Sequence, residues 1–192
     1  NEKFTYFEDA VKYFSPESMT ALDNRGTSAM HTAAFMNHAD MLKAMIEGGA
    51  DINVTQDAPA NAGETPLHVA CRRGNKEVVQ LLVEKGADES ICNVNGEAPA
   101  HMPFIEKIGY NERAENYAEM LRYLKNIDVQ RNDGKTPLML LQRQPIGIIS
   151  AVQSIFIEKG AQLDKKDNAG NTALITATRE HCYKDTVKEL VR

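Results

Sequence analysis

The sequence predicts an all-α solenoid made of stacked antiparallel helix pairs, with hairpin-like fingers projecting from one side. Three observations predict this fold. A block that begins with glycine occurs five times, and its copies start 37, 33, 38 and 36 residues apart. A second block that contains Gly-Ala follows three of these copies in step, and the stretches between blocks carry apolar residues at helical spacing. A fixed period of roughly 20 to 50 residues is typical of repeat architectures.

The first block has the chemistry of a helix start. Its clearest copy, at 63–68, reads G-E-T-P-L-H. Threonine is a good N-cap, and proline suits the first helical position because its missing N–H would have no partner there. The other copies lie at 26–31, 96–101, 134–139 and 170–175. The second block reads E-K-G-A-D at 84–88, and its glycine is the residue expected at a left-handed helix C-cap.

The motifs G-x-T-P-L-H-x-A and L-L-x-x-G-A-D-I-N at a base period of 33 residues resemble those of ankyrin repeats. The resemblance covers residues 23–192 and implies an ankyrin-repeat solenoid. Its five units would span approximately 23–59, 60–92, 93–130, 131–166 and 167–192. Residues 1–22 would form an N-terminal helix or a degenerate capping repeat, since Phe4, Phe7, Val11 and Phe14 share one helical face.

The second unit illustrates the elements in order. A helix should begin at Pro66, and the small residues Val69-Ala70-Cys71 keep it slim enough for its neighbours to stack closely. A second helix is predicted over 76–84, with Val78, Val79, Leu81 and Leu82 facing the stack. The run from Gly86 to Gly96 would then form the next finger.

Several departures from the repeat are expected to alter its geometry. The extra residues in Thr55 to Asn61 predict a longer finger, and Pro103 lies just inside the first helix of the third unit. An enlarged loop is expected near 105–114, for which neutral drift of a surface loop is an equally good explanation. Met139 and Ile175 replace the motif histidine, whose imidazole in the family ties finger to helix, so the last two units should bond differently.

Composition limits the classes of partner and the cellular compartments that fit this chain. A net charge of -5 gives no general attraction to nucleic acid or to anionic lipid, and no stretch is long and apolar enough to insert into a membrane. Three cysteines, an odd number, favour a reducing, intracellular location in cytoplasm or nucleus. The N-terminus lacks the charged and apolar segments of a signal peptide, and the chain stops within the last unit, so we expect a fragment of a longer protein. The domain is expected to be monomeric.

Structural roles explain the histidines and cysteines better than catalysis or metal binding does. His68 and Cys71 are three residues apart on a helix, a spacing that suits two metal ligands, but both occupy structural positions of the repeat. His181-Cys182 are adjacent residues whose side chains point apart, which does not suit a nucleophile and its base. No phosphate-binding loop occurs. We therefore expect neither enzyme activity nor a cofactor or metal. A zinc-dependent hydrolase using the histidines is the least favoured alternative.

The resemblance implies that fingers and first helices line a concave surface that binds another protein or peptide. Carrying its exposed positions over to this sequence gives the candidate contact residues Asn24, Arg25, Phe35, Met36, Asn61, Glu64, Arg72, Arg73, Val94, Asn95 and Ile105. Glu97 and Gln144 occupy equivalent positions in later units. The area where the longer finger meets Phe35 and Arg72 is the predicted hot spot.

Phe35 and Met36 are large apolar residues at positions that should face water, so they are candidate anchors; packing of Phe35 on the preceding finger is the alternative. Arginines outnumber carboxylates in the first-helix positions, which favours an acidic partner. Phe35→Ala with Arg72→Glu is expected to weaken binding at little cost in stability. A segment that regulates or scaffolds a larger enzyme, channel or receptor by intramolecular contact is the second candidate function.

Overall fold

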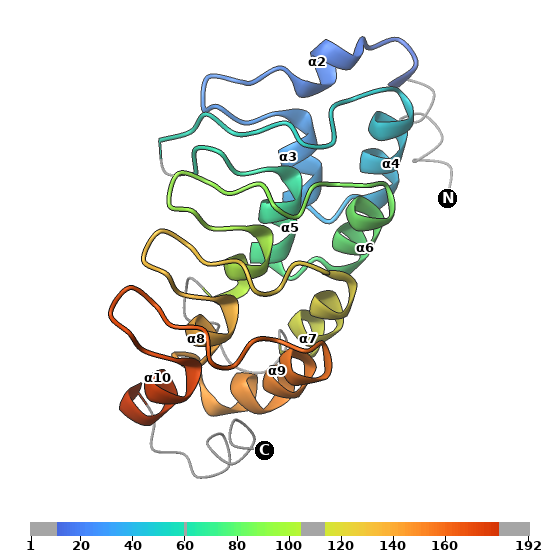
Figure 1. Cartoon of the computed structure of the whole chain (residues 1–192). Helices are drawn as coiled ribbons and strands as arrows, with labels where there is room; N and C mark the ends of the chain where they lie inside the picture. The colour runs from blue at the N-terminus through green and yellow to red at the C-terminus, as the bar shows by residue number, and fades with distance from the viewer. Residues whose placement is uncertain (1–10, 60, 105–113, 181–192) are drawn as a thin grey trace.

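The computed structural model describes residues 11–59, 61–104 and 114–180. These residues form an all-helical stack, and none of them lies in a β-strand. Inner helices form one row and outer helices a second row beside it, while the fingers project on the side of the inner row (Figure 1). This arrangement confirms the predicted solenoid.

Each row collects one type of helix. The inner row contains α3 (Ala29–Phe35), α5 (Pro66–Arg73), the 3₁₀ helix η1 (Pro99–Phe104), α8 (Pro137–Leu141) and α10 (Ala173–Glu180). The outer row contains α4 (Ala39–Glu47), α6 (Lys76–Glu84), α7 (Ala114–Tyr123) and α9 (Ile146–Glu158). A short helix, α2 (Pro16–Thr20), contacts α3 at the N-terminal end.

The boundaries of the second unit follow from the predicted capping chemistry. Thr65, in extended conformation, is the N-cap of α5, and Pro66 is its first residue. Helix α6 covers 76–84, as predicted from the apolar spacing. Gly86 follows it with a φ of +88°, the left-handed conformation that glycine adopts without a steric penalty.

The core runs along the interface between the two rows. Ala70 and Cys71 are fully buried on α5, whose small side chains allow it to pack against both α3 and η1. On the outer row, Leu82 of α6 is completely buried, while Leu81 is only half-buried. Burial of Leu82 is as predicted, but Leu81 lies at the edge of the core.

The third unit is irregular at its first helix. Six residues from Pro99 to Phe104 form a 3₁₀ helix with Pro103 inside it. Proline lacks the N–H that an α-helix needs at an interior position, and its ring clashes with the preceding turn, so the tighter helix replaces the regular one. The predicted distortion at Pro103 is confirmed, whereas the loop expected after it lies outside the described residues.

The N-terminal segment is only partly described. Phe4 and Phe7, two of the four residues expected to share an apolar face, precede the described residues. Val11 is buried in the core, but Phe14 is 57% exposed. The chain turns there and enters α2 with Ser15 as its N-cap, so Phe14 does not join the core.

Successive fingers are connected by main-chain hydrogen bonds. The Asp57 N–H donates to the Gly26 carbonyl at 3.0 Å, and three further bonds of this kind join Val94 to Ala62, Asn132 to Asn95, and Asn168 to Asp133. Gly96 has a φ of +74°, and a Cβ there would lie 2.7 Å from the Asn132 amide nitrogen. Glycine at this position therefore permits the close approach of the next finger.

Histidines form a second set of links between units. The Nε2 atoms of His31, His68 and His101 donate to carbonyls of the next finger, at Glu64, Glu97 and Lys135, over 2.9–3.1 Å. Met139 and Ile175 lack such a donor. At the fourth junction Gln130 Nε2 instead donates to the Lys166 carbonyl at 2.9 Å. The altered bonding expected where Met139 replaces the histidine is thus confirmed, and Gln130 is a link that the sequence does not reveal.

Candidate functional site

A cavity of about 370 Å³ opens between the first two fingers and the inner helices α3 and α5. It lies in the area predicted as the hot spot. Five of the candidate contact residues line it, namely Arg25, Phe35, Met36, Asn61 and Arg72. Gln56 and Val69, which sequence reasoning did not single out, also belong to its walls. The structure thus brings together residues from two fingers and two helices.

The most apolar wall of the cavity comes from the C-terminal end of α3. Phe35 is 47% exposed and Met36 is 58% exposed, so two large apolar side chains face water, as predicted. The guanidinium carbon of Arg73 lies 4.4 Å from the centroid of the Phe35 ring. This cation–π contact restrains the ring without burying it. Phe35 therefore presents an aromatic surface of which about half is exposed.

Gln56 lies at the stem of the longer finger. Its N–H donates to the Glu64 carbonyl at 2.8 Å, and its carbonyl accepts from the Gly63 N–H at 2.9 Å. These two bonds fix the main chain of Gln56, and the residue is 8% exposed. Gln56 Oε1 has no hydrogen-bond partner among the described residues. A buried polar atom without a partner is unusual in a folded protein and calls for an explanation.

Glu64 is buried, contrary to the prediction that it faces a partner. It is only 1% exposed. Its carboxylate accepts a hydrogen bond from Arg72, whose Nη2 also lies 3.5 Å from the Met102 sulfur. Burial raises the pKa of Glu64, and the positive charge of Arg72 opposes that rise. Arg72 neutralises a buried acid, so Arg72→Glu would place two carboxylates together and destabilise the fold, contrary to the expectation above.

Other predicted contact residues have varied surroundings. Asn24, Arg73, Val94 and Asn95 are exposed, as expected, while Asn61 is half-buried. Arg25 is exposed and pairs with Asp23 at 3.0 Å. Ile105 lies outside the described residues.

Glu97 and Gln144 were also expected to face a partner and are buried instead. The Gln144 side chain donates to the Phe104 carbonyl at 3.0 Å, so it fills the space behind the irregular helix η1. Glu97 is 5% exposed and belongs to a polar network between fingers. Positions that are exposed in a regular repeat are thus covered where neighbouring side chains bridge units.

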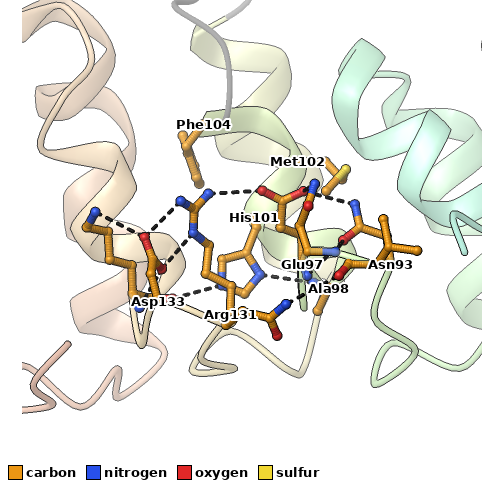
Figure 2. A network of polar contacts seen from close by, with 12 residues as sticks. Asn93, Glu97, Ala98, His101, Met102, Phe104, Arg131 and Asp133 are labelled. Carbon is orange, nitrogen blue, oxygen red and sulfur yellow. Dashed lines mark hydrogen bonds and ion pairs between the residues drawn. The ribbon is translucent and has the colours of Figure 1, made fainter. Parts of the chain in front are cut away.

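Figure 2 shows this network, with the Arg131 guanidinium between the carboxylates of Glu97 and Asp133. Arg131 Nη1 donates to Glu97 at 2.9 Å, and Nε and Nη2 donate to Asp133 at 2.7 and 2.8 Å. Asn93 Nδ2 donates to the other Glu97 oxygen at 2.9 Å. Hydrogen bonds from Arg131 and from Lys135 keep the pKa of Asp133 well below its usual range. The ion pair between Arg131 and Glu97 joins the fourth finger to the third.

Each motif histidine has both ring nitrogens occupied. His68 Nδ1 accepts from the Thr65 N–H at 3.1 Å, while Nε2 donates to the Glu97 carbonyl. This pair of bonds requires the neutral imidazole, and burial lowers the pKa of His68 to about 4. Burial also raises the pKa of Cys71 well above its usual value. Both ring nitrogens of His68 are thus engaged within the chain, and burial favours the protonated thiol of Cys71.

Comparison with protein-family models matches almost the whole repeat region. A model described as ankyrin repeats (many copies) matches residues 30–83 and 67–102, and one described as ankyrin repeats (3 copies) matches residues 111–192. The chain belongs to the ankyrin-repeat family. Ankyrin repeats are generally protein–protein interaction modules and are typically not catalytic. A search of curated proteins finds no match to this ankyrin chain.

The described part of the ankyrin chain has other cavities of similar volume, about 430, 350 and 300 Å³. It contains no group of three or more His, Cys, Asp or Glu residues arranged to hold a metal ion. None of its helices is long and apolar enough to span a bilayer. The cavity beside Phe35 combines five predicted contact residues with two exposed apolar side chains, and a function is best argued from it.

The histidine links predict how stability depends on pH. Burial depresses the pKa of His31, His68 and His101 in the folded ankyrin stack, so below pH 6.5 the unfolded chain binds more protons, and for His68 this window extends down to about pH 4. The stabilisation is complete above pH 6.5 and is lost as the pH falls toward 4. His68 alone contributes a slope of up to about 1.4 kcal/mol per pH unit in that window.

Urea unfolding at pH 7, 5.5 and 4.5 measures this slope in the chain and in His68→Gln. The variant should be less stable at pH 7 and should show a shallower decline. The raised pKa of Glu64 acts in the opposite direction, since the folded state then binds the extra proton. Equal slopes in the two proteins would contradict the role assigned to His68.

Proposed function

We propose that this ankyrin-repeat chain binds another protein or peptide, without catalysis, through the surface formed by its fingers and inner helices. The observation that carries the proposal is the exposed pair Phe35 and Met36 beside the cavity. Aromatic and methionine side chains are enriched at interfaces, where large apolar groups fill pockets of a partner. An exposed apolar pair at the rim of a concavity is the arrangement such a contact requires.

The charge distribution refines the proposed partner. A net charge of -5 argues against nucleic acid, as inferred from composition. Arg25 and Arg72 are paired with Asp23 and Glu64, which reduces the positive field expected from the sequence. Arg73, stacked on Phe35, makes no ion pair with a described residue. The preference for acidic groups is therefore proposed to be local to Phe35. The domain is proposed to act as an intracellular monomer.

Phe35→Ala tests the proposal directly. The variant should weaken partner binding at least tenfold, about 1.4 kcal/mol, because the exposed ring contributes contact area to the partner. Its melting temperature should change little, since the ring is half in water. Partner capture with the chain from a cell extract, followed by calorimetric titration of the purified partner, measures both affinities.

Tyr123→Ala is the matched control, because Tyr123 is an aromatic residue of similar exposure on the outer helix α7. This control should bind as the parent chain does. Equal binding by the parent and Phe35→Ala, or loss of binding in Tyr123→Ala alone, would contradict a contact through the inner surface.

A further inference from the structure

We propose that the cavity beside Phe35 takes one apolar side chain of an extended partner segment, that Gln56 hydrogen-bonds the main chain of this segment, and that Arg73 pairs with a neighbouring acidic side chain. The inference rests on the proposed function and specifies its chemistry. Three independent features of the described residues support it: the apolar wall, the unsatisfied amide and the charges around them.

The apolar wall defines the side chain that would enter. Phe35 and Met36 at the end of α3 and Val69 of α5 are the apolar residues of its lining. The volume of about 370 Å³ lies within the range typical of ligand pockets, roughly 300 to 1,000 Å³. Methionine adapts its shape to different apolar groups. A leucine, methionine or aromatic residue therefore fits the cavity better than a small or charged one.

The Gln56 amide defines the polar contact. Its side chain lines the cavity at 8% exposure, and Oε1 lacks a partner. Asn93 occupies the corresponding position of the third finger, and its Oδ1 accepts hydrogen bonds from the N–H groups of Asn95 and Glu97 at 2.9 and 3.0 Å. A carboxamide both donates and accepts, as does a peptide group. An extended main chain crossing the cavity would supply the hydrogen bond that the chain itself does not supply.

The charges define what flanks the apolar side chain. No aspartate or glutamate belongs to the described lining, whereas Arg25 and Arg72 do. Both are paired with acids of the chain, but Arg73 is held against Phe35 without a carboxylate partner among the described residues. Arginine binds carboxylates through paired N–H groups. An aspartate or glutamate within about two residues of the apolar side chain would reach it.

Selection from a phage-displayed library of random dodecapeptides against the full chain tests the proposal. Enriched peptides should combine a leucine, methionine or aromatic residue with a nearby aspartate or glutamate. A synthetic peptide of the enriched sequence should then bind Gln56→Leu and Arg73→Ala at least fivefold more weakly in fluorescence anisotropy. Arg179→Ala is the matched control, because Arg179 is an exposed arginine of the inner helix α10. It should bind unchanged.

Methionine methyl NMR provides a readout that does not depend on the variants. The Met36 methyl signal should shift on adding the peptide, whereas that of Met45, buried in α4, should not. Melting temperatures confirm that the variants are folded. Selection of basic peptides, or an unmoved Met36 signal, overturns this inference. Binding that is lost in Arg179→Ala but retained in Gln56→Leu overturns it while leaving the proposed function intact, and selection of no peptide overturns it as well.

Discussion

Replacing Leu82 with alanine is expected to lower the free energy of unfolding by about 3–4 kcal/mol. The side chain is completely buried on α6, which contacts α4, α5 and α7. Truncation removes apolar contacts with several helices and leaves a cavity that neighbouring units can close only in part. Urea denaturation of the parent chain and of the variant at pH 7 measures the difference.

Leu81→Ala is the control for this experiment, because the two leucines are adjacent in sequence and differ mainly in burial. Leu81 is half-buried, so its truncation should cost about 1 kcal/mol. Equal losses in the two variants would mean that the outer row does not pack as described. The comparison needs no assumption about the unfolded chain beyond its being the same in both proteins.

Arg131→Met is expected to lower the free energy of unfolding by about 2–3 kcal/mol. The substitution leaves Glu97, 5% exposed, without the cation that compensates its burial. The estimate lies below the usual cost of breaking a fully buried pair, because the Arg131 side chain is 23% exposed and Asn93 still donates to Glu97.

Glu97→Gln provides a rescue for this effect. In the double variant a neutral amide replaces the buried charge and can still accept from Asn93, so about half of the lost stability should return. A double-mutant cycle by urea denaturation gives the coupling energy between the two side chains. A coupling energy near zero would show that the ion pair in Figure 2 does not hold the two fingers together.

The fold could be predicted because repetition turns weak local signals into a strong one. Thr65-Pro66 marks a helix start, Gly86 marks a helix end, and their recurrence in register fixes how the units stack. The apolar spacing predicts that Phe14 shares a buried face, because periodicity does not reveal where a helix ends and the chain turns away from the core. Its exposure follows from the turn before α2, which the apolar pattern does not encode.

The site was harder to predict because exposure depends on the side chains of neighbouring units. Phe35 and Met36 stand out as large residues at positions open to water. Glu64 and Glu97 look equally accessible in sequence, yet arginines on another element cover each of them. Gln56 lay within the longer finger without any special spacing. Its importance comes from its Oε1 atom, which is buried without a hydrogen-bond donor among the described residues, and only the folded structure shows this.

The fourth junction uses Gln130 where the first three use a histidine, so the two ends of the stack should respond differently to acid. Three junctions toward the N-terminus depend on neutral imidazoles, whereas the fourth uses an amide that does not titrate. As the pH falls toward 4, protonation of these imidazoles should therefore weaken the three N-terminal junctions, including the one beside the Phe35 cavity, before the junction at Gln130 opens. Any partner held at that cavity would be released in an acidic environment while the far end of the molecule stays folded.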